Sequence, residues 1–340
     1  MEKNQKNIKN NLYQNKIELL NNIINEPYIK YIKVNSFISF KSIYDILYLI
    51  YSTKNISIIF YNLINNKKVN EIRNAHQKYI TNFRHYLDSY NKKDLIISIS
   101  LEDNNIKLWN INNCELLLNI KNVNSNGGLL SACFLNDNNQ TYIITSNQNV
   151  YIIESIKVFN LDGNIFKIIN NSNYSVCYID TYYDIKNSKI YIITCNGACI
   201  RAYDYINNQI YNIYNESGEI NSVTNICFTI NNKEEMIELC KEGNIRIWNF
   251  HSAKLLKIIK IDGFDQIECF CLLDEQNIFV GCADKTIKDV QLKDGKIIKN
   301  YNGHNNEVNY ITIINHPKYD KILISQGWER DGIRVWKINE

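Results

Sequence analysis

The chain has 340 residues, of which 45% are hydrophobic and 21% charged, and its formal net charge is +3. The share of hydrophobic residues is ample for a buried core. Because Lys and Arg form no long basic block, we do not expect nucleic acid as a partner. No run approaches 18 apolar residues and the polar start lacks the apolar core of a signal peptide, so we expect no membrane insertion. Ten Cys without such a signal predict free thiols and a cytoplasmic location, with the nucleus as the alternative.

The first 27 residues are interpreted as a polar N-terminal extension that carries a short amphipathic helix. Between Gln14 and Asn25, four apolar side chains recur at helical spacing, and Pro27 ends the run. We expect this helix to pack against the rest of the fold, with a partner-binding helix as the alternative.

Residues 28–340 repeat one short motif, the end of a β-strand with an aromatic or apolar residue at its centre. The distance from one central residue to the next is about 42 to 50 residues, the period of a four-stranded propeller blade. Each repeat also contains short runs rich in Ile, Val, Tyr and Phe, separated by Asn, Asp, Gly and Lys. The sequence therefore predicts an all-β fold, a seven-bladed β-propeller of four-stranded blades. The seven central residues are Tyr61, Trp109, Phe159, Tyr203, Trp248, Val290 and Trp336.

The fifth repeat gives the clearest strand pattern, and the seventh repeat is incomplete. In the fifth repeat, the four strands are predicted over residues 222–230, 236–241, 245–249 and 255–261. The seventh repeat reaches Glu340 just after its third strand. The segment Tyr28 to Val34 resembles the outer strand of the fifth repeat, so we expect it to pair with the last blade and close the ring.

The period and several local motifs resemble the WD-repeat (Trp-Asp repeat) β-propeller family. The best matches are Gly303-His304 with Trp336, Ala75-His76 with Trp109, and the turn that begins at Asp103. In that family a His, a Ser or Thr, an Asp and a Trp form a buried hydrogen-bonded set in each blade. The resemblance places two such sets here, with Ser98 as the alternative to Ser100: His76, Ser100, Asp103 and Trp109, and His304, Ser325, Asp331 and Trp336. No Trp-Asp dipeptide occurs, and Val290 stands where the sixth blade would have its Trp.

Motifs that carry catalysis or bind cofactors and metals are absent from the sequence. It contains no phosphate-binding loop, no Gly-x-Ser-x-Gly elbow and no His-Glu-x-x-His run. Of the five His, His76 and His304 belong to the sets above, and His85, His251 and His316 have no second ligand at metal-binding spacing. Cys195 and Cys199 likewise have no second cluster. We expect no enzymatic activity, no cofactor and no metal site.

Loops that connect blades, or that join the second strand of a blade to its third, are the expected binding rim. Loops on a rigid scaffold are favoured binding positions, and Trp and Arg are frequent interface hot spots. The candidate rim residues are Tyr79, Glu102, Tyr174, Lys241, Glu307, Trp328 and Arg330.

The sequence favours a non-enzymatic scaffold that binds a protein or peptide on this rim, as a monomeric propeller within a complex. The alternatives are a substrate receptor or adaptor of a ubiquitin ligase, and a hydrolase with a site in the channel mouth. Members of the family that dock on one such ligase carry an Arg two residues after the Trp-Asp pair. Those positions here hold Asn112, His251 and Asn339, which argues against that route.

Overall fold

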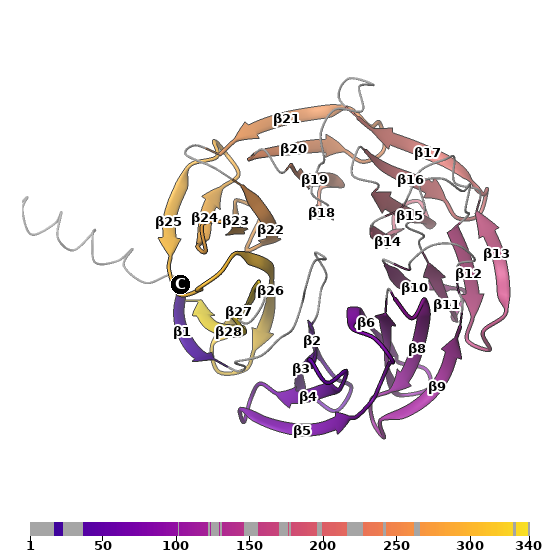
Figure 1. Ribbon diagram of the computed structural model, residues 1–340. Helices are drawn as coiled ribbons and strands as arrows, with labels where there is room; N and C mark the ends of the chain where they lie inside the picture. Colours follow the sequence, from indigo (N-terminus) through magenta and orange to yellow (C-terminus); the bar gives the residue numbers. More distant parts are fainter. Residues whose placement is uncertain are drawn as a thin grey trace, which may run out of the picture. The chain divides into compact units, whose positions relative to one another are not determined.

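The chain folds as an all-β seven-bladed β-propeller, and each blade is a four-stranded sheet (Figure 1). The predicted fold class is thus confirmed. The computed structural model describes residues 17–22, 37–100, 102–121, 123, 129, 131–145, 156–169, 176, 178–195, 199–215, 227–240, 243–261, 266–328 and 331–338. Within these ranges no helix has the length and apolar character needed to cross a bilayer.

The chain divides into two compact units, and the larger, Ile29–Ile267, contains five blades. Within each blade the strands follow one another in sequence order from the inner to the outer edge. Blades one and two are β2 (Phe37–Lys41), β3 (Leu47–Ser52), β4 (Ile58–Asn62) and β5 (Lys67–Ile72), then β6 (Ile80–Asp88), β7 (Lys93–Ser100), β8 (Asn105–Asn110) and β9 (Glu115–Ile120). Blades three and four are β10 (Ala132–Asp137), β11 (Gln140–Thr145), β12 (Ile156–Asn160) and β13 (Ile165–Ile169), then β14 (Tyr178–Asp184), β15 (Lys189–Cys195), β16 (Ile200–Asp204) and β17 (Gln209–Tyr214). Blade five is β18 (Cys227–Ile230), β19 (Glu235–Leu239), β20 (Asn244–Asn249) and β21 (Leu255–Lys260).

The smaller unit joins Met1–Tyr28 to Glu268–Glu340 and contains the last two blades. Blade six is β22 (Ile267–Leu272), β23 (Asn277–Cys282), β24 (Ile287–Gln291) and β25 (Ile297–Tyr301). Blade seven is β26 (Val308–His316), β27 (Asp320–Gly327) and β28 (Ile333–Ile338), and its fourth strand is β1 (Ile17–Asn22), antiparallel to β28.

The strand β1 corrects the prediction of a helix over residues 14–25. Backbone pairing joins Ile17 to Ile338 and Asn22 to Arg334. The free edge of β28 offers a row of backbone hydrogen bonds, and such pairing outweighs the helical spacing of a short isolated segment. The predicted strand over residues 28–34 lies outside the described residues, and ring closure by that segment stays a prediction.

The repeated motif of the sequence corresponds to one structural feature, a register shift between the third and fourth strands. In each of blades one to six the shift falls immediately before the repeated central residue. In blade five, for example, it lies between Ile247 and Trp248. A β-bulge bends a strand and increases its twist, so the repeat marks the point where each blade curves toward its outer edge.

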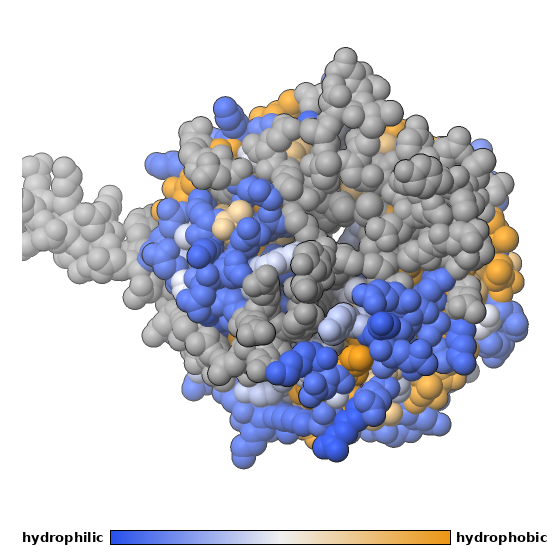
Figure 2. All heavy atoms as spheres, viewed as in Figure 1, coloured by the Kyte–Doolittle hydropathy of each residue, from blue (hydrophilic) through white to orange (hydrophobic). Residues whose placement is uncertain are grey.

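The core of the larger unit forms between neighbouring blades. Its inner strands β2, β6, β10 and β14 pack against one another, and side chains such as Phe83, Leu135 and Ile179 are fully or almost fully buried. The outer strands instead leave apolar side chains in solvent, and Figure 2 shows this apolar surface over β13. On that strand Ile165 is 52% and Phe166 55% exposed.

The alternating direction of the strands gives the larger unit two faces, which we name from their turns. Face A carries the turns that join strands one to two and three to four of each blade. Face B carries the loops that join strands two to three and the loops between blades, which include the predicted rim residues Tyr79 and Glu102.

Candidate functional site

The predicted set in blade seven is a connected hydrogen-bond network. The Ser325 hydroxyl lies 2.6 Å from His304 Nε2 and accepts a hydrogen bond of 2.7 Å from Trp336 Nε1. Asp331 Oδ2 lies 2.7 Å from His304 Nδ1, and Arg334 binds both carboxylate oxygens. Burial opposes the Asp331 charge, but the hydrogen bonds from His304 and Arg334 outweigh it and lower the pKa of Asp331 well below its usual value. These hydrogen bonds tie His304, Asp331 and Trp336 together and stabilise the blade.

Blade two contains the same arrangement, with Ser98 in place of the predicted Ser100. His76 Nε2 lies 2.8 Å from Ser98 Oγ, and Trp109 Nε1 donates to the same oxygen at 2.8 Å. Ser100 instead accepts a weak bond of 3.4 Å from the Asp103 backbone. The choice of Ser100 was wrong because Ser98 pairs with Lys107 and Ser100 with Asn105, so only Ser98 lies near enough to Trp109 on β8.

In the second set, burial favours the neutral form of His76. Desolvation, with a smaller contribution from the nearby Lys107, lowers the pKa of His76 to about 4. His76 Nδ1 lies 3.5 Å from Asp103 Oδ2, a longer separation than the one between His304 and Asp331. Asp103 Oδ2 instead accepts from the backbone of Gln77 and Lys78. Like the first, this set is structural.

The predicted rim residues of blade seven come together at one loop. Glu307 directly precedes β26, Trp328 directly follows β27, and the Trp328 backbone donates a 2.7 Å hydrogen bond to the Glu307 carbonyl. The Trp328 side chain is half-buried. Arg330 lies outside the described residues, as do Tyr174 and Lys241.

The rim residues of blade two lie together on face B. Tyr79 precedes β6 and Glu102 follows β7, at the end where Ile80 pairs with Ser100. The Glu102 carboxylate forms an exposed ion pair of 3.7 Å with Lys78. Tyr79 is 40% exposed. An exposed ion pair of this length contributes little to stability, and this surface is accessible to solvent.

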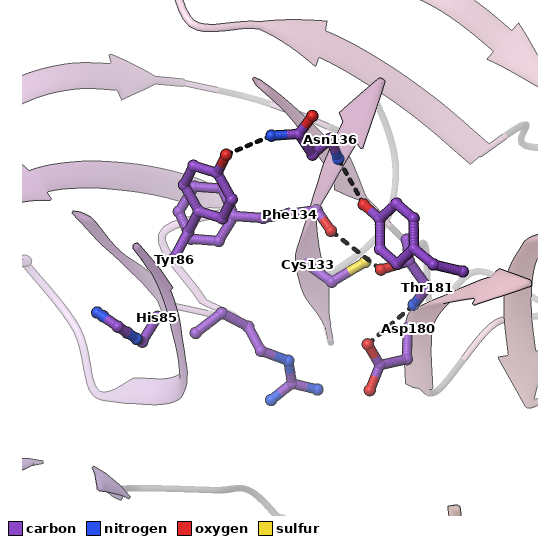
Figure 3. A pocket seen from close by; sticks show the side chains of 9 residues that line it. His85, Tyr86, Cys133, Phe134, Asn136, Asp180 and Thr181 are labelled. Carbon is purple, nitrogen blue, oxygen red and sulfur yellow. Dashed lines mark hydrogen bonds between the residues drawn. The ribbon is translucent and has the colours of Figure 1, made fainter. Parts of the chain in front are cut away.

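A pocket of about 280 Å³ lies between the inner strands of blades two, three and four (Figure 3). Its lining comes from β6, β10 and β14, and mostly from the halves of β6 and β14 that lead to face A. The pocket is smaller than most cofactor sites, so it suits a side chain of a partner better than a large cofactor. The lining residues are Arg84, His85, Tyr86, Cys133, Phe134, Asn136, Asp180, Thr181 and Tyr183.

Hydrogen bonds between blades hold the pocket walls in place. The Asn136 amide donates to the Tyr86 hydroxyl, and the Asn136 backbone donates to Tyr183 at 2.5 Å. Thr181 Oγ1 donates to the Phe134 carbonyl at 3.2 Å, and Figure 3 shows these groups along one side of the pocket. These bonds pre-form the cavity, because all three inner strands are fixed to one another through side chains.

The pocket contains charges of both signs together with a buried thiol. The Arg84 guanidinium stacks 5.1 Å from the centre of the Tyr178 ring, and Asp180 accepts hydrogen bonds from Tyr178 and from the Thr181 backbone. Burial, reinforced by the Asp180 charge, raises the pKa of the Cys133 thiol well above its usual value. A protonated, buried thiol is a poor nucleophile, so the pocket is suited to binding rather than to covalent catalysis.

Large apolar side chains are exposed at the turns of face A. Tyr90 in the β6–β7 turn and Ile185 in the β14–β15 turn are each 88% exposed, and both follow strands that line the pocket. Tyr44, Ile64 and Ile206 are exposed in other turns of the same face. Each is a single apolar side chain at the tip of a turn, which a bound partner would remove from water. Sequence reasoning placed the binding residues on face B, although the turns Ser89-Tyr90-Asn91 and Asp184-Ile185-Lys186 show an apolar residue between polar ones.

The chain matches no model of a known protein family, and no curated protein matches it in sequence.

Proposed function

We propose that the chain is a non-enzymatic scaffold, similar to the WD-repeat proteins, that binds a protein partner. The His-Ser-Trp hydrogen bonds in blades two and seven support the likeness to that family, since the same two bonds form around Ser98 and Ser325. Because these His, Ser and Trp side chains are buried and bonded to one another, we look for the binding site on the surface of the blades.

Face A of the larger unit is the proposed docking surface. The observation that carries this proposal is the exposure of Tyr90 and Ile185 beside a pre-formed pocket. An aromatic and an aliphatic side chain at turn tips supply apolar area, and the pocket can receive one side chain of the partner. The Arg84 and Asp180 side chains would orient a polar group that enters the pocket.

The experiment compares partner capture by two double variants of the full-length chain, purified from its native cells. Tyr90→Ser/Ile185→Ser removes the apolar tips of face A, and Tyr79→Ser/Glu102→Gln changes the predicted rim on face B. All four side chains are substantially exposed, so both variants are expected to fold, which circular dichroism checks.

We expect the face A variant to lose a partner that the wild type and the face B variant both retain. Loss in the face B variant alone would return the binding site to the predicted rim. Retention by both variants would contradict a docking role for face A.

A further inference from the structure

Three potential metal ligands that are distant in sequence meet on face A between blades four and five. Asp184 is the last residue of β14, Glu234 lies in the β18–β19 turn, and His251 lies in the turn after β20. One ligand atom from each lies within 4.8 Å of the other two. His251 Nε2 is 3.7 Å from Asp184 Oδ2 and 3.5 Å from Glu234 Oε2.

Hydrogen bonds fix each of the three side chains from outside the cluster. Asn187 donates to both oxygens of Asp184, and Lys186 Nζ binds Glu234 Oε1 at 2.6 Å. Tyr211 Oη lies 3.2 Å from His251 Nδ1. Such outer partners orient ligands and set the tautomer of a metal-binding His.

The backbone that carries the cluster is also fixed. The Phe250 backbone donates to the Glu234 carbonyl at 3.0 Å, which ties the two turns of blade five together. The Asn212 amide donates to the carbonyls of Phe250 and His251, from the neighbouring blade. The separation of the three ligands is therefore set by the fold.

His251 Nε2 faces two carboxylates without a hydrogen bond to either. The atom is buried and has no hydrogen-bond partner among the described residues, while Nδ1 is engaged by Tyr211. When Nδ1 carries the ring proton, the Nε2 lone pair points at two negative groups. A cation at the centre of the three atoms removes this repulsion.

We propose that Asp184, Glu234 and His251 bind a divalent transition-metal ion, with Zn²⁺ as the representative. Ligands about 2.1 Å from a tetrahedral zinc lie about 3.4 Å from one another, close to both distances measured from His251 Nε2. One imidazole nitrogen with two carboxylate oxygens suits zinc and its neighbours, whereas Mg²⁺ and Ca²⁺ prefer oxygen ligands alone.

The proposed site lies near the surface, and the described residues supply three ligands. The Glu234 and His251 side chains are 21% and 26% exposed. Three protein ligands leave a fourth position for water or another group. The site is independent of the proposed partner, because every ligand comes from this chain.

The test is a calorimetric titration of the metal-free, full-length protein with Zn²⁺, beside His251→Gln and Asp184→Asn. His316→Gln is the matched control, because His316 Nδ1 accepts a 3.1 Å hydrogen bond from the Lys318 backbone and His316 belongs to no three-ligand group among the described residues. Absorption spectra with Co²⁺ separate this site from the free Cys, since a thiolate ligand adds a sulfur-to-metal charge-transfer band.

We expect one equivalent of Zn²⁺ to bind to the wild type and to His316→Gln, and at least about 10-fold weaker binding in the two cluster variants. Mg²⁺ should not compete, and bound Co²⁺ should show no thiolate band. Equal Zn²⁺ affinity in the wild type and His251→Gln, or no binding to the folded wild type, would overturn the proposal.

Discussion

A single serine hydroxyl organises the polar core in each of two blades. Ser98 and Ser325 each contact a His and accept a hydrogen bond from a Trp indole, and both are fully buried. A buried polar group is tolerated when its hydrogen bonds are made, and it is costly when one partner is removed. These residues therefore contribute to stability rather than to binding.

The substitution Trp109→Ala is expected to lower the free energy of unfolding by about 3–5 kcal/mol. The change removes a large buried ring and one hydrogen bond to Ser98. Thermal unfolding of the wild type and the variant measures the effect, with Tyr90→Ala, an exposed aromatic, as the control. An unchanged Tm for Trp109→Ala would refute the structural role of this set.

The buried His76 predicts a loss of stability in mild acid. Its pKa is lowered to about 4 in the folded state, against an ordinary value of 6.5, chiefly because of burial. Below about pH 6.5 the unfolded chain takes up a proton that the folded chain does not, so the free energy of unfolding falls, by about 2 kcal/mol at pH 5. Above pH 6.5 this group causes no further change.

Thermal unfolding at pH 7 and pH 5 checks this prediction, with His76→Gln as the comparison. The Gln variant does not titrate, so its Tm should fall less between the two pH values than that of the wild type. An equal fall in both proteins would assign the acid sensitivity to other groups, such as His304, whose pKa burial also lowers.

At the scale of the element, the sequence predicts where the strands of a blade lie, but it does not predict that residues 17–22 form a strand. The fifth repeat predicts strands over 236–241, 245–249 and 255–261, and the structure has β19, β20 and β21 within one residue of most of these boundaries. Alternation and turn residues encode such strands locally. The β1 strand was missed because its conformation depends on the distant edge of β28, which the local spacing does not encode.

The packing of β23 in the smaller unit predicts that Gly281→Ala is destabilising. A Cβ atom at this position would lie 2.5 Å from Cys269 Sγ and 2.8 Å from the Val308 carbonyl oxygen. Both groups belong to neighbouring strands in the buried core, so the strands must separate, at a cost of about 1–3 kcal/mol. Urea unfolding measures this cost, and an unchanged midpoint would contradict the close packing.

At the scale of the whole molecule, the period of the sequence predicts the fold, while the candidate sites arise from residues far apart in the chain. The pocket unites Arg84, Cys133 and Asp180, and the proposed metal ligands come from the end of β14 and from two turns of blade five. Arg84, Cys133 and Asp180 follow one another at the blade period, but the period does not reveal which repeated positions line a pocket or that His251 joins Asp184 and Glu234. Tyr90 and Ile185 stand out in the sequence as apolar residues between polar ones, but their exposure follows only from the structure.

The most direct test of the account is photo-crosslinking from single positions on the two faces. A photoreactive phenylalanine analogue replaces Ile185 on face A or Tyr79 on face B in the full-length chain, and both positions are exposed. We predict that position 185 crosslinks to a specific protein partner and that position 79 does not. Crosslinks from position 79 alone would place the partner on the predicted rim and contradict the assignment of face A.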